Sequence, residues 1–241
     1  MASVKITDRD YNENNLIYVK NTLSEIFSQT HTKAEIKQLG SRSVLTIELC
    51  DYYKDILKSE IYDKVADVIS INYKYEYFKK HVNPSGLNEI ERELLLTSLI
   101  SADLEEDKKY ALDKIKGFDE IAIDGIYNFR MVPLKKKLNE IISYMPDYFI
   151  NSQLKEFIAY LIEGKQKRIY IDDNVVYDMH YRRLKKGDLM DRNIEDGKII
   201  REVILSGGGE IELNSKISLL DEKYLKEFYG DKVIISKGYF S

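Results

Sequence analysis

With 241 residues and an apolar fraction of 44%, the chain is large enough for one sizeable domain or two small ones, which argues against a disordered protein. Its 37 basic and 41 acidic residues give a net charge of -4, which argues against attraction of the whole surface to nucleic acid or anionic lipid. The single cysteine, Cys50, excludes an internal disulfide and indicates a compartment that keeps thiols reduced.

An N-terminal α/β unit is predicted for residues 1–52. Apolar side chains recur at helical spacing over residues 15–28 and predict an amphipathic helix. Residues 44–49 alternate between apolar and polar, which predicts a strand. Residues 33–39 are typical of either a partner strand or a helix, so both assignments stay open.

A helical core is predicted for residues 53–164. The 3.6-residue period runs through residues 56–77, a length that only a long helix fills, and it stops before Pro84 and Gly86. Further helices are expected downstream, over residues 87–102, 104–116, 134–145 and 147–163, with residues 121–130 ambiguous. The strongest apolar stripe lies on the last of these helices and comprises Ile150, Leu154, Phe157, Ile158 and Leu161.

A C-terminal α/β unit is predicted for residues 165–241. Residues 168–177 indicate a hairpin, and residues 198–205 suit either a helix or a strand. The strand, helix and strand expected at 210–213, 219–229 and 232–236 imply a parallel pair of strands. The predicted fold class is therefore α+β, a mainly helical middle with small α/β units at both ends, and one continuous domain is the alternative to three segments.

Four stretches of the middle region form a recognisable series of motifs. Lys64-Val-Ala-Asp-Val-Ile69 resembles an Ala-Asp-Val-Ile helix, and residues 73–78 resemble the aromatic stretch that follows such a helix. Gly125-Ile-Tyr-Asn-Phe-Arg-Met131 resembles a Gly-Phe-x-Asn-Phe-Arg-Leu block, and residues 155–158 resemble a Glu-Phe-Ile helix. In this order the motifs resemble those of the YtxC-like sporulation protein family of spore-forming Firmicutes.

The resemblance covers about residues 44–163, and this copy is divergent, since Ile126 and Met131 replace Phe and Leu. Membership would imply a cytosolic protein associated with sporulation. The family supplies no catalytic residues to transfer to this chain.

Asn128 and Arg130 are the strongest candidate pair of polar residues for binding a ligand, because the guanidinium group of arginine can bind a carboxylate or phosphate through two hydrogen bonds. An arginine flanked by Phe129 and Met131 more often holds two helices together through a neighbouring carboxylate. We therefore predict that Arg130 is buried and paired, and we keep the pair as a candidate contact for a ligand or partner.

Basic and tyrosine residues interleave around the predicted hairpin. Phosphate contacts plus aromatic stacking are the physics of a nucleic-acid surface, whereas the nearby aspartates favour a solvated face. The candidate contact residues of this region are Lys165, Lys167, Arg168, Arg182, Arg183, Lys185 and Lys186.

No motif in the sequence assembles a catalytic or metal site. His31, His81 and His180 lack metal-ligand spacing, and Cys50 is expected to be a small buried side chain. The glycine run 206–209 lacks the spacing of a phosphate-binding loop and precedes Glu210, so a tight connection before a strand is the better interpretation.

The sequence thus predicts a non-enzymatic cytoplasmic protein that acts through a macromolecular partner, with no cofactor, no metal and no membrane segment. No apolar run approaches the roughly 20 residues that span a bilayer, and residues 1–15 lack the apolar core of a signal peptide. Two alternatives stay open: a nucleic-acid-binding protein that uses residues 165–186, and a hydrolase or transferase whose site forms only in the folded chain.

Overall fold

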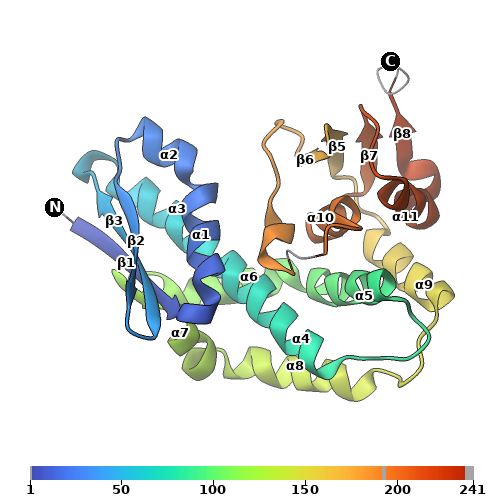
Figure 1. Ribbon diagram of the computed structural model, residues 1–241, viewed down its shortest axis with the longest axis horizontal. Coiled ribbons are helices and arrows are strands. Elements are labelled where there is room, and N and C mark those ends of the chain that lie inside the picture. Colours follow the sequence, from blue (N-terminus) through green and yellow to red (C-terminus); the bar gives the residue numbers. More distant parts are fainter. Residues whose placement is uncertain (1, 192–193, 237–241) are drawn as a thin grey trace. The chain divides into compact units, whose positions relative to one another are not determined.

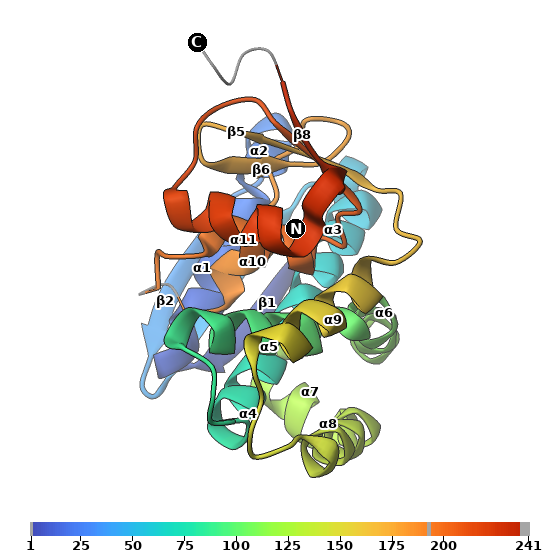
Figure 2. The same cartoon turned by 90° about the vertical axis from the view of Figure 1, so that its right-hand side faces the viewer.

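The structure, a computed structural model, describes residues 2–191 and 194–236 and has the predicted α+β fold (Figures 1 and 2). The chain forms two compact units. Unit 1 contains the chain up to Lys74 and Glu105–Glu140, and unit 2 contains Tyr75–Leu104 and the chain from Ile141 onward. Each unit joins two separate stretches of sequence, so the predicted borders at residues 52 and 164 do not coincide with the borders of these units.

Unit 1 is built around a four-stranded sheet with the strand order β2-β3-β1-β4. β1 pairs antiparallel with β3 and parallel with β4. The elements of this unit are β1 (Ala2–Arg9), α1 (Glu13–Thr22), α2 (Ser24–Gln29), β2 (Ala34–Leu39), β3 (Arg42–Leu49), α3 (Lys54–Asp67), α6 (Leu104–Ile115), β4 (Glu120–Ala122), α7 (Ile123–Arg130) and the start of α8 (Val132–Tyr144).

Strand β1 is an element that the sequence does not predict. Its buried positions are Val4, Ile6 and Asp8, so the third position of the apolar alternation is a charged residue. The alternation is therefore too short to be recognised in a segment rich in charges. The neighbouring ambiguity at residues 33–39 is resolved as strand β2, which pairs with β3.

The long helix predicted over residues 56–77 exists, but a π-helical segment, Val68–Tyr73, separates α3 from α4 (Lys74–His81). A wider π turn shifts the face that the following residues present. At its end Tyr73 donates a hydrogen bond to Asp8, and the ammonium group of Lys74, fully buried, lies 2.5 Å from Asp107. The π segment thus directs two successive polar side chains to two different buried carboxylates.

Unit 2 packs helices against a second four-stranded sheet, of order β6-β5-β7-β8. β5 pairs antiparallel with β6 and parallel with β7, and β7 pairs parallel with β8, as expected for the last two strands. The elements are α4, α5 (Glu89–Ala102), α9 (Asn151–Ile162), β5 (Arg168–Asp172), β6 (Val175–Tyr177), α10 (Lys198–Leu205), β7 (Glu210–Leu213), α11 (Leu219–Tyr229) and β8 (Val233–Ile235).

Helix α10 is the centre of unit 2, because every residue from Ile199 to Leu205 is buried. Its first turn is capped by Asp221 of α11, which accepts a hydrogen bond from the backbone N–H of Ile200 at 3.0 Å. Its buried Glu202 accepts the backbone N–H groups of Lys186 and Gly187. Burial raises the pKa of Glu202, although these hydrogen bonds oppose the rise.

The apolar stripe predicted on α9 is partly correct. Leu154 and Ile158 are fully buried, whereas Phe157 and Leu161 are half-buried and Ile150 is 37% exposed. Ile150 precedes the first helical turn, and Asn151 donates a hydrogen bond to Glu91 at 2.8 Å. Glu91 belongs to the capping box that begins α5, so the starts of α5 and α9 are tied together.

Candidate partner-binding face

One side of the unit 2 sheet carries the aromatic and basic residues that the sequence singles out. Helix α10 leads from β6 into β7, helix α11 connects the parallel strands β7 and β8, and both helices lie on one side of the sheet (Figure 2). Ile169, Ile171, Ile211 and Leu213 point to that side and are buried. The alternate residues of the same strands point to the opposite side and are half-buried or exposed, so that side is not covered by α10 or α11.

Three tyrosines gather on this uncovered side. Tyr170 of β5 lies opposite Tyr177 of β6 in the strand register. Tyr181, which is 62% exposed, stacks on Tyr170 with the ring centroids 4.8 Å apart and the planes at 20°. We call this surface the tyrosine face, and it comprises Arg168, Tyr170, Tyr177, Tyr181, Glu210 and Glu212.

A tight turn after β6 positions Tyr181. The carboxylate of Asp178 accepts hydrogen bonds from the backbone N–H of His180 and of Arg182, and also from the Arg182 guanidinium at 2.9 Å. Burial tends to raise the pKa of Asp178, but the hydrogen bonds from Arg182 and His180 outweigh burial and lower it. Tyr181 adopts a positive φ of 56°, which this hydrogen-bonded turn maintains.

The tyrosine face carries one arginine and two glutamates. Arg168 donates to Glu210 through two nitrogens, at 2.9 and 3.2 Å. The register places Glu212 beside Tyr170. Arginine, tyrosine and carboxylate side chains therefore alternate over a small area, without an excess of cations.

The structure does not gather the predicted basic residues into one patch. Only Arg168, Arg182 and Arg183 lie next to the tyrosines, Arg183 through a bridge to Tyr177. The ammonium group of Lys167 donates to the backbone oxygen of Ser206 at 2.8 Å, and Lys165 lines a pocket of about 320 Å³ beside Gly207. Lys185 and Lys186 lie at the short 3-10 turn, where the Lys186 N–H donates to Glu202.

The run Ser206 to Gly209 connects α10 to β7, as the sequence predicts. A Cβ atom on Gly209 would overlap the backbone oxygen of Lys165, and one on Gly208 would lie 2.7 Å from Ile169. Gly209 instead donates its N–H to Lys167 at 2.8 Å. The glycines are therefore required by close packing of the connection against the start of β5.

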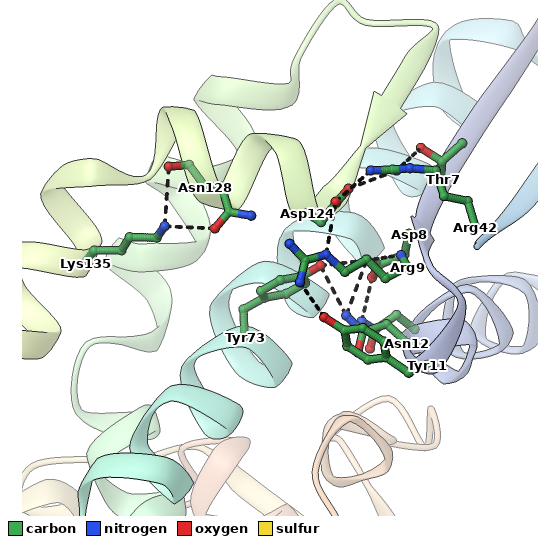
Figure 3. A network of polar contacts seen from close by, with 11 residues as sticks. Thr7, Asp8, Arg9, Tyr11, Asn12, Arg42, Tyr73, Asp124, Asn128 and Lys135 are labelled. Carbon is green, nitrogen blue, oxygen red and sulfur yellow. Dashed lines mark hydrogen bonds and ion pairs between the residues drawn. The ribbon is translucent and has the colours of Figure 1, made fainter. Parts of the chain in front are cut away.

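The candidate pair Asn128 and Arg130 lies on the exposed end of α7 in unit 1. Asn128 accepts a hydrogen bond from Lys135 at 3.0 Å (Figure 3). Arg130 is exposed, and its guanidinium lies 4.6 Å from the ring centroid of Phe118. The prediction of a buried Arg130 paired with a carboxylate is therefore wrong, because α7 turns Ile126 and Tyr127 toward the core and its last residues outward.

Unit 1 contains a polar network that the sequence does not predict (Figure 3). Asp8 is fully buried and accepts hydrogen bonds from Asn15 at 2.8 Å and from Tyr73 at 2.7 Å. Burial raises the pKa of Asp8, although its hydrogen bonds, first of all that from Asn15, oppose the rise. The only sequence signal is the position of Asp8 in an apolar alternation.

The second carboxylate of this network, Asp124, opens helix α7. Arg42 donates two hydrogen bonds to it, at 3.1 and 2.7 Å, and Arg9 lies 3.5 Å away (Figure 3). Because both carboxylates are already engaged by neighbouring donors, the network ties β1, β3 and α7 together. It is a structural feature, and we assign no chemistry to it.

The histidines and the cysteine considered as candidates in the sequence are taken last. Over residues 2–191 and 194–236, no group of His, Cys, Asp and Glu side chains is arranged to hold a metal ion. Cys50 is exposed, so the expectation that it is buried is wrong; it follows Leu49, the last buried residue of β3. In the same part of the chain no helix is both long and apolar enough to cross a bilayer.

Comparison of the chain with protein-family models, with curated proteins and with solved structures finds no match. The resemblance of residues 44–163 to the YtxC-like family therefore stays a prediction.

Proposed function

We propose that this chain is a non-enzymatic protein that binds a protein partner through the tyrosine face of unit 2. The observation that carries the proposal is the stack of Tyr181 on Tyr170, displayed on a sheet side that α10 and α11 leave uncovered. Tyrosine and arginine are the residues enriched at protein interfaces, where they supply rigid contact area and hydrogen bonds together.

The charge balance of the face favours a protein partner over nucleic acid. Nucleic-acid binding draws most of its affinity from cations that neutralise phosphates. Here Arg168 is paired with Glu210 and Arg182 with Asp178, and Glu212 adds a further negative charge beside Tyr170. A surface of mixed charge suits a partner that also carries both signs.

We place this activity in the cytosol of a spore-forming bacterium, during or around sporulation. The support is the resemblance of residues 64–69 and 125–131 to the YtxC-like family. Partner capture from sporulating and from vegetative cells tests this placement separately from the binding face.

A second candidate is nucleic-acid binding, which one observation favours. The stacked rings of Tyr170 and Tyr181 resemble the aromatic platforms on which bases stack, and Arg183 lies beside Tyr177. Under this alternative the tyrosines would contact bases, and affinity would fall steeply with added salt.

Affinity capture with matched variants tests the proposal. The wild-type protein, Tyr181→Ser and Tyr52→Ser are used as baits in extracts of sporulating cells, and the captured material is identified by mass spectrometry after nuclease treatment. Tyr52 is a suitable control because it is an exposed tyrosine, at 84%, in unit 1. We expect a protein that wild type and Tyr52→Ser retain and Tyr181→Ser loses; equal capture by all three baits would contradict the proposal.

A further inference from the structure

Strand β2 forms a free edge of the unit 1 sheet. In the order β2-β3-β1-β4 it pairs with β3 on one side, and no described residue of unit 1 pairs with its other side. The strand runs over Ala34–Leu39, whereas the other edge strands of the two sheets, β4, β6 and β8, have three residues each. A very short edge strand is protected against pairing with another chain, and β2 lacks this protection.

The pairing of β2 with β3 determines which backbone groups of β2 face the free edge. The backbone N–H of Glu48 donates to the backbone oxygen of Lys33 at 2.9 Å, so Lys33 is bonded toward β3. In an antiparallel pair this direction alternates from one residue to the next. The backbone N–H and C=O groups of Ala34, Ile36 and Gln38 therefore point away from β3, and no described hydrogen bond of unit 1 uses them.

Two side chains of opposite charge flank the centre of this edge. Glu35 and Lys37 are 66% and 65% exposed, and the ammonium group of Lys37 lies 2.9 Å from the carboxylate of Glu35. Both lie on one face of the strand, and Ile36 points to the other face, where its partner in the register, Leu45, is buried. A two-fold rotation about an axis through Ile36 therefore brings each charge opposite a charge of the other sign.

We propose that two copies of this chain dimerise by pairing their β2 strands antiparallel, with Ile36 at the centre. In this register Ile36 lies opposite Ile36 of the second copy, and Ala34 lies opposite Gln38. These are the residues whose backbone groups face the free edge, so each such pair can exchange two hydrogen bonds. The two four-stranded sheets would join into one continuous sheet, in a closed symmetrical dimer.

Charge complementarity favours a second copy as the occupant of this edge, in this register. Glu35 lies opposite Lys37 of the second copy at a non-hydrogen-bonded position, where side chains approach most closely. An edge with charges of one sign would instead repel a second copy. A register centred on Ala34 would pair much of β2 with residues that precede the strand. A register centred on Gln38 would place Lys37 opposite Leu39 and lose both ion pairs.

Sedimentation velocity of the full chain over a range of concentrations tests for the dimer. We expect a species with twice the mass of one chain, whose share grows with concentration. Tyr181→Ser should leave this species unchanged, because Tyr181 lies on the tyrosine face of unit 2. A wild-type chain that stays monomeric at every concentration, or a dimer that Tyr181→Ser abolishes, would overturn the proposal.

Charge reversal tests the register. Glu35→Lys and Lys37→Glu each bring like charges opposite each other in the homodimer, so each should weaken dimerisation by about tenfold. A mixture of the two variants restores opposite charges across the interface, so they should pair with each other more tightly than either pairs with itself. The chain that carries both changes should dimerise like the wild type.

Two further reversals serve as controls. Glu25→Lys and Lys109→Glu change the same charges at exposed helical positions of unit 1, and both should dimerise like the wild type. A dimer that Glu35→Lys and Lys37→Glu both retain, or a mixture of these two variants that forms no heterodimer, would show that the edge of β2 is not the interface.

Amide hydrogen exchange gives a readout that does not depend on charge. The N–H of Ile36 faces the free edge, so it should exchange rapidly in dilute, monomeric protein and slowly in the dimer. The N–H of Glu35 faces β3 at either concentration, so its exchange should not change. Equal exchange of Ile36 in monomer and dimer would overturn the proposal.

Discussion

Tyr73 donates a 2.7 Å hydrogen bond to Asp8, which joins the end of the π-helical segment to the buried end of strand β1. The same carboxylate also accepts from Asn15, so one charged residue connects β1, α1 and the π segment of unit 1. This relationship explains why a carboxylate occupies a position that the strand alternation reserves for an apolar side chain.

Replacing Tyr73 by Phe should lower the free energy of unfolding by about 1 to 3 kcal/mol, because a buried carboxylate loses a donor. Denaturant unfolding monitored by circular dichroism measures the change. Tyr52→Phe is the control, since Tyr52 is 84% exposed and should show no effect. Equal stability of the Tyr73 variant and the wild type would contradict a structural role for this hydrogen bond.

Asp8 should make the stability of unit 1 depend on pH. Its pKa is raised in the folded chain, so the protonated form is favoured by folding. This stabilisation is complete below the unfolded pKa of about 3.9 and is lost as the pH rises through the folded value. Asn at position 8 cannot titrate, so the stability of wild type relative to Asp8→Asn should fall as the pH rises. A relative stability that grows with pH would show that folding lowers the pKa of Asp8 instead of raising it.

Leu154→Ala should cost about 2 to 5 kcal/mol of unfolding free energy, because Leu154 is fully buried in unit 2. Leu161 lies on the same helix and is half-buried, so Leu161→Ala is a matched comparison with a smaller expected cost. Thermal melts of both variants test whether Leu154→Ala lowers the melting temperature more than Leu161→Ala does. If Leu154→Ala melts at the wild-type temperature, the buried stripe is a surface feature.

Asp178→Asn should release Tyr181 from Tyr170, because a neutral side chain holds Arg182 less strongly and the turn loses its charge-assisted hydrogen bonds. Ring proton shifts of Tyr170 and Tyr181 in NMR spectra report the loss of stacking. Asp172→Asn is the control, since Asp172 ends β5 outside this turn. Unchanged ring shifts in Asp178→Asn would show that the turn does not position Tyr181.

Oligonucleotide binding should be weak or absent at physiological salt, because two of the three arginines near the tyrosines, Arg168 and Arg182, are paired with carboxylates. Titration of labelled single- and double-stranded oligonucleotides at two salt concentrations measures this. Tight binding that falls steeply with salt, and falls further in Arg183→Glu, would favour the nucleic-acid alternative.

Strongly periodic helices are readily predicted from this sequence, and the parallel pairing of β7 and β8 follows from short strand and helix signals. The sequence does not predict β1, because Asp8 takes the third position of its apolar face. It does not predict the π segment either, because residues 65–71 are all buried and the change of face leaves no solvent-facing gap in the pattern.

The candidate site is predicted only in part. Tyr170, Tyr177 and Tyr181 are close in sequence, and the hairpin keeps their rings close in space, whereas the basic residues around them do not form one patch. The pairing of Arg168 with Glu210 depends on the parallel register of β5 and β7, which local patterns do not contain. Burial of Arg130 is wrongly predicted, because flanking apolar residues do not determine which way a helix end faces.

Photocrosslinking at position 181 tests directly whether the tyrosine face binds a protein partner. A photoreactive phenylalanine analogue replaces Tyr181 in one strain and the exposed Tyr52 in another, and both strains are irradiated in growing cultures and under the sporulation conditions of the proposal. We expect a covalent product at position 181 that contains a second protein, resists nuclease and is absent for position 52. A product that nuclease removes, or the absence of any product at position 181, would contradict the proposal.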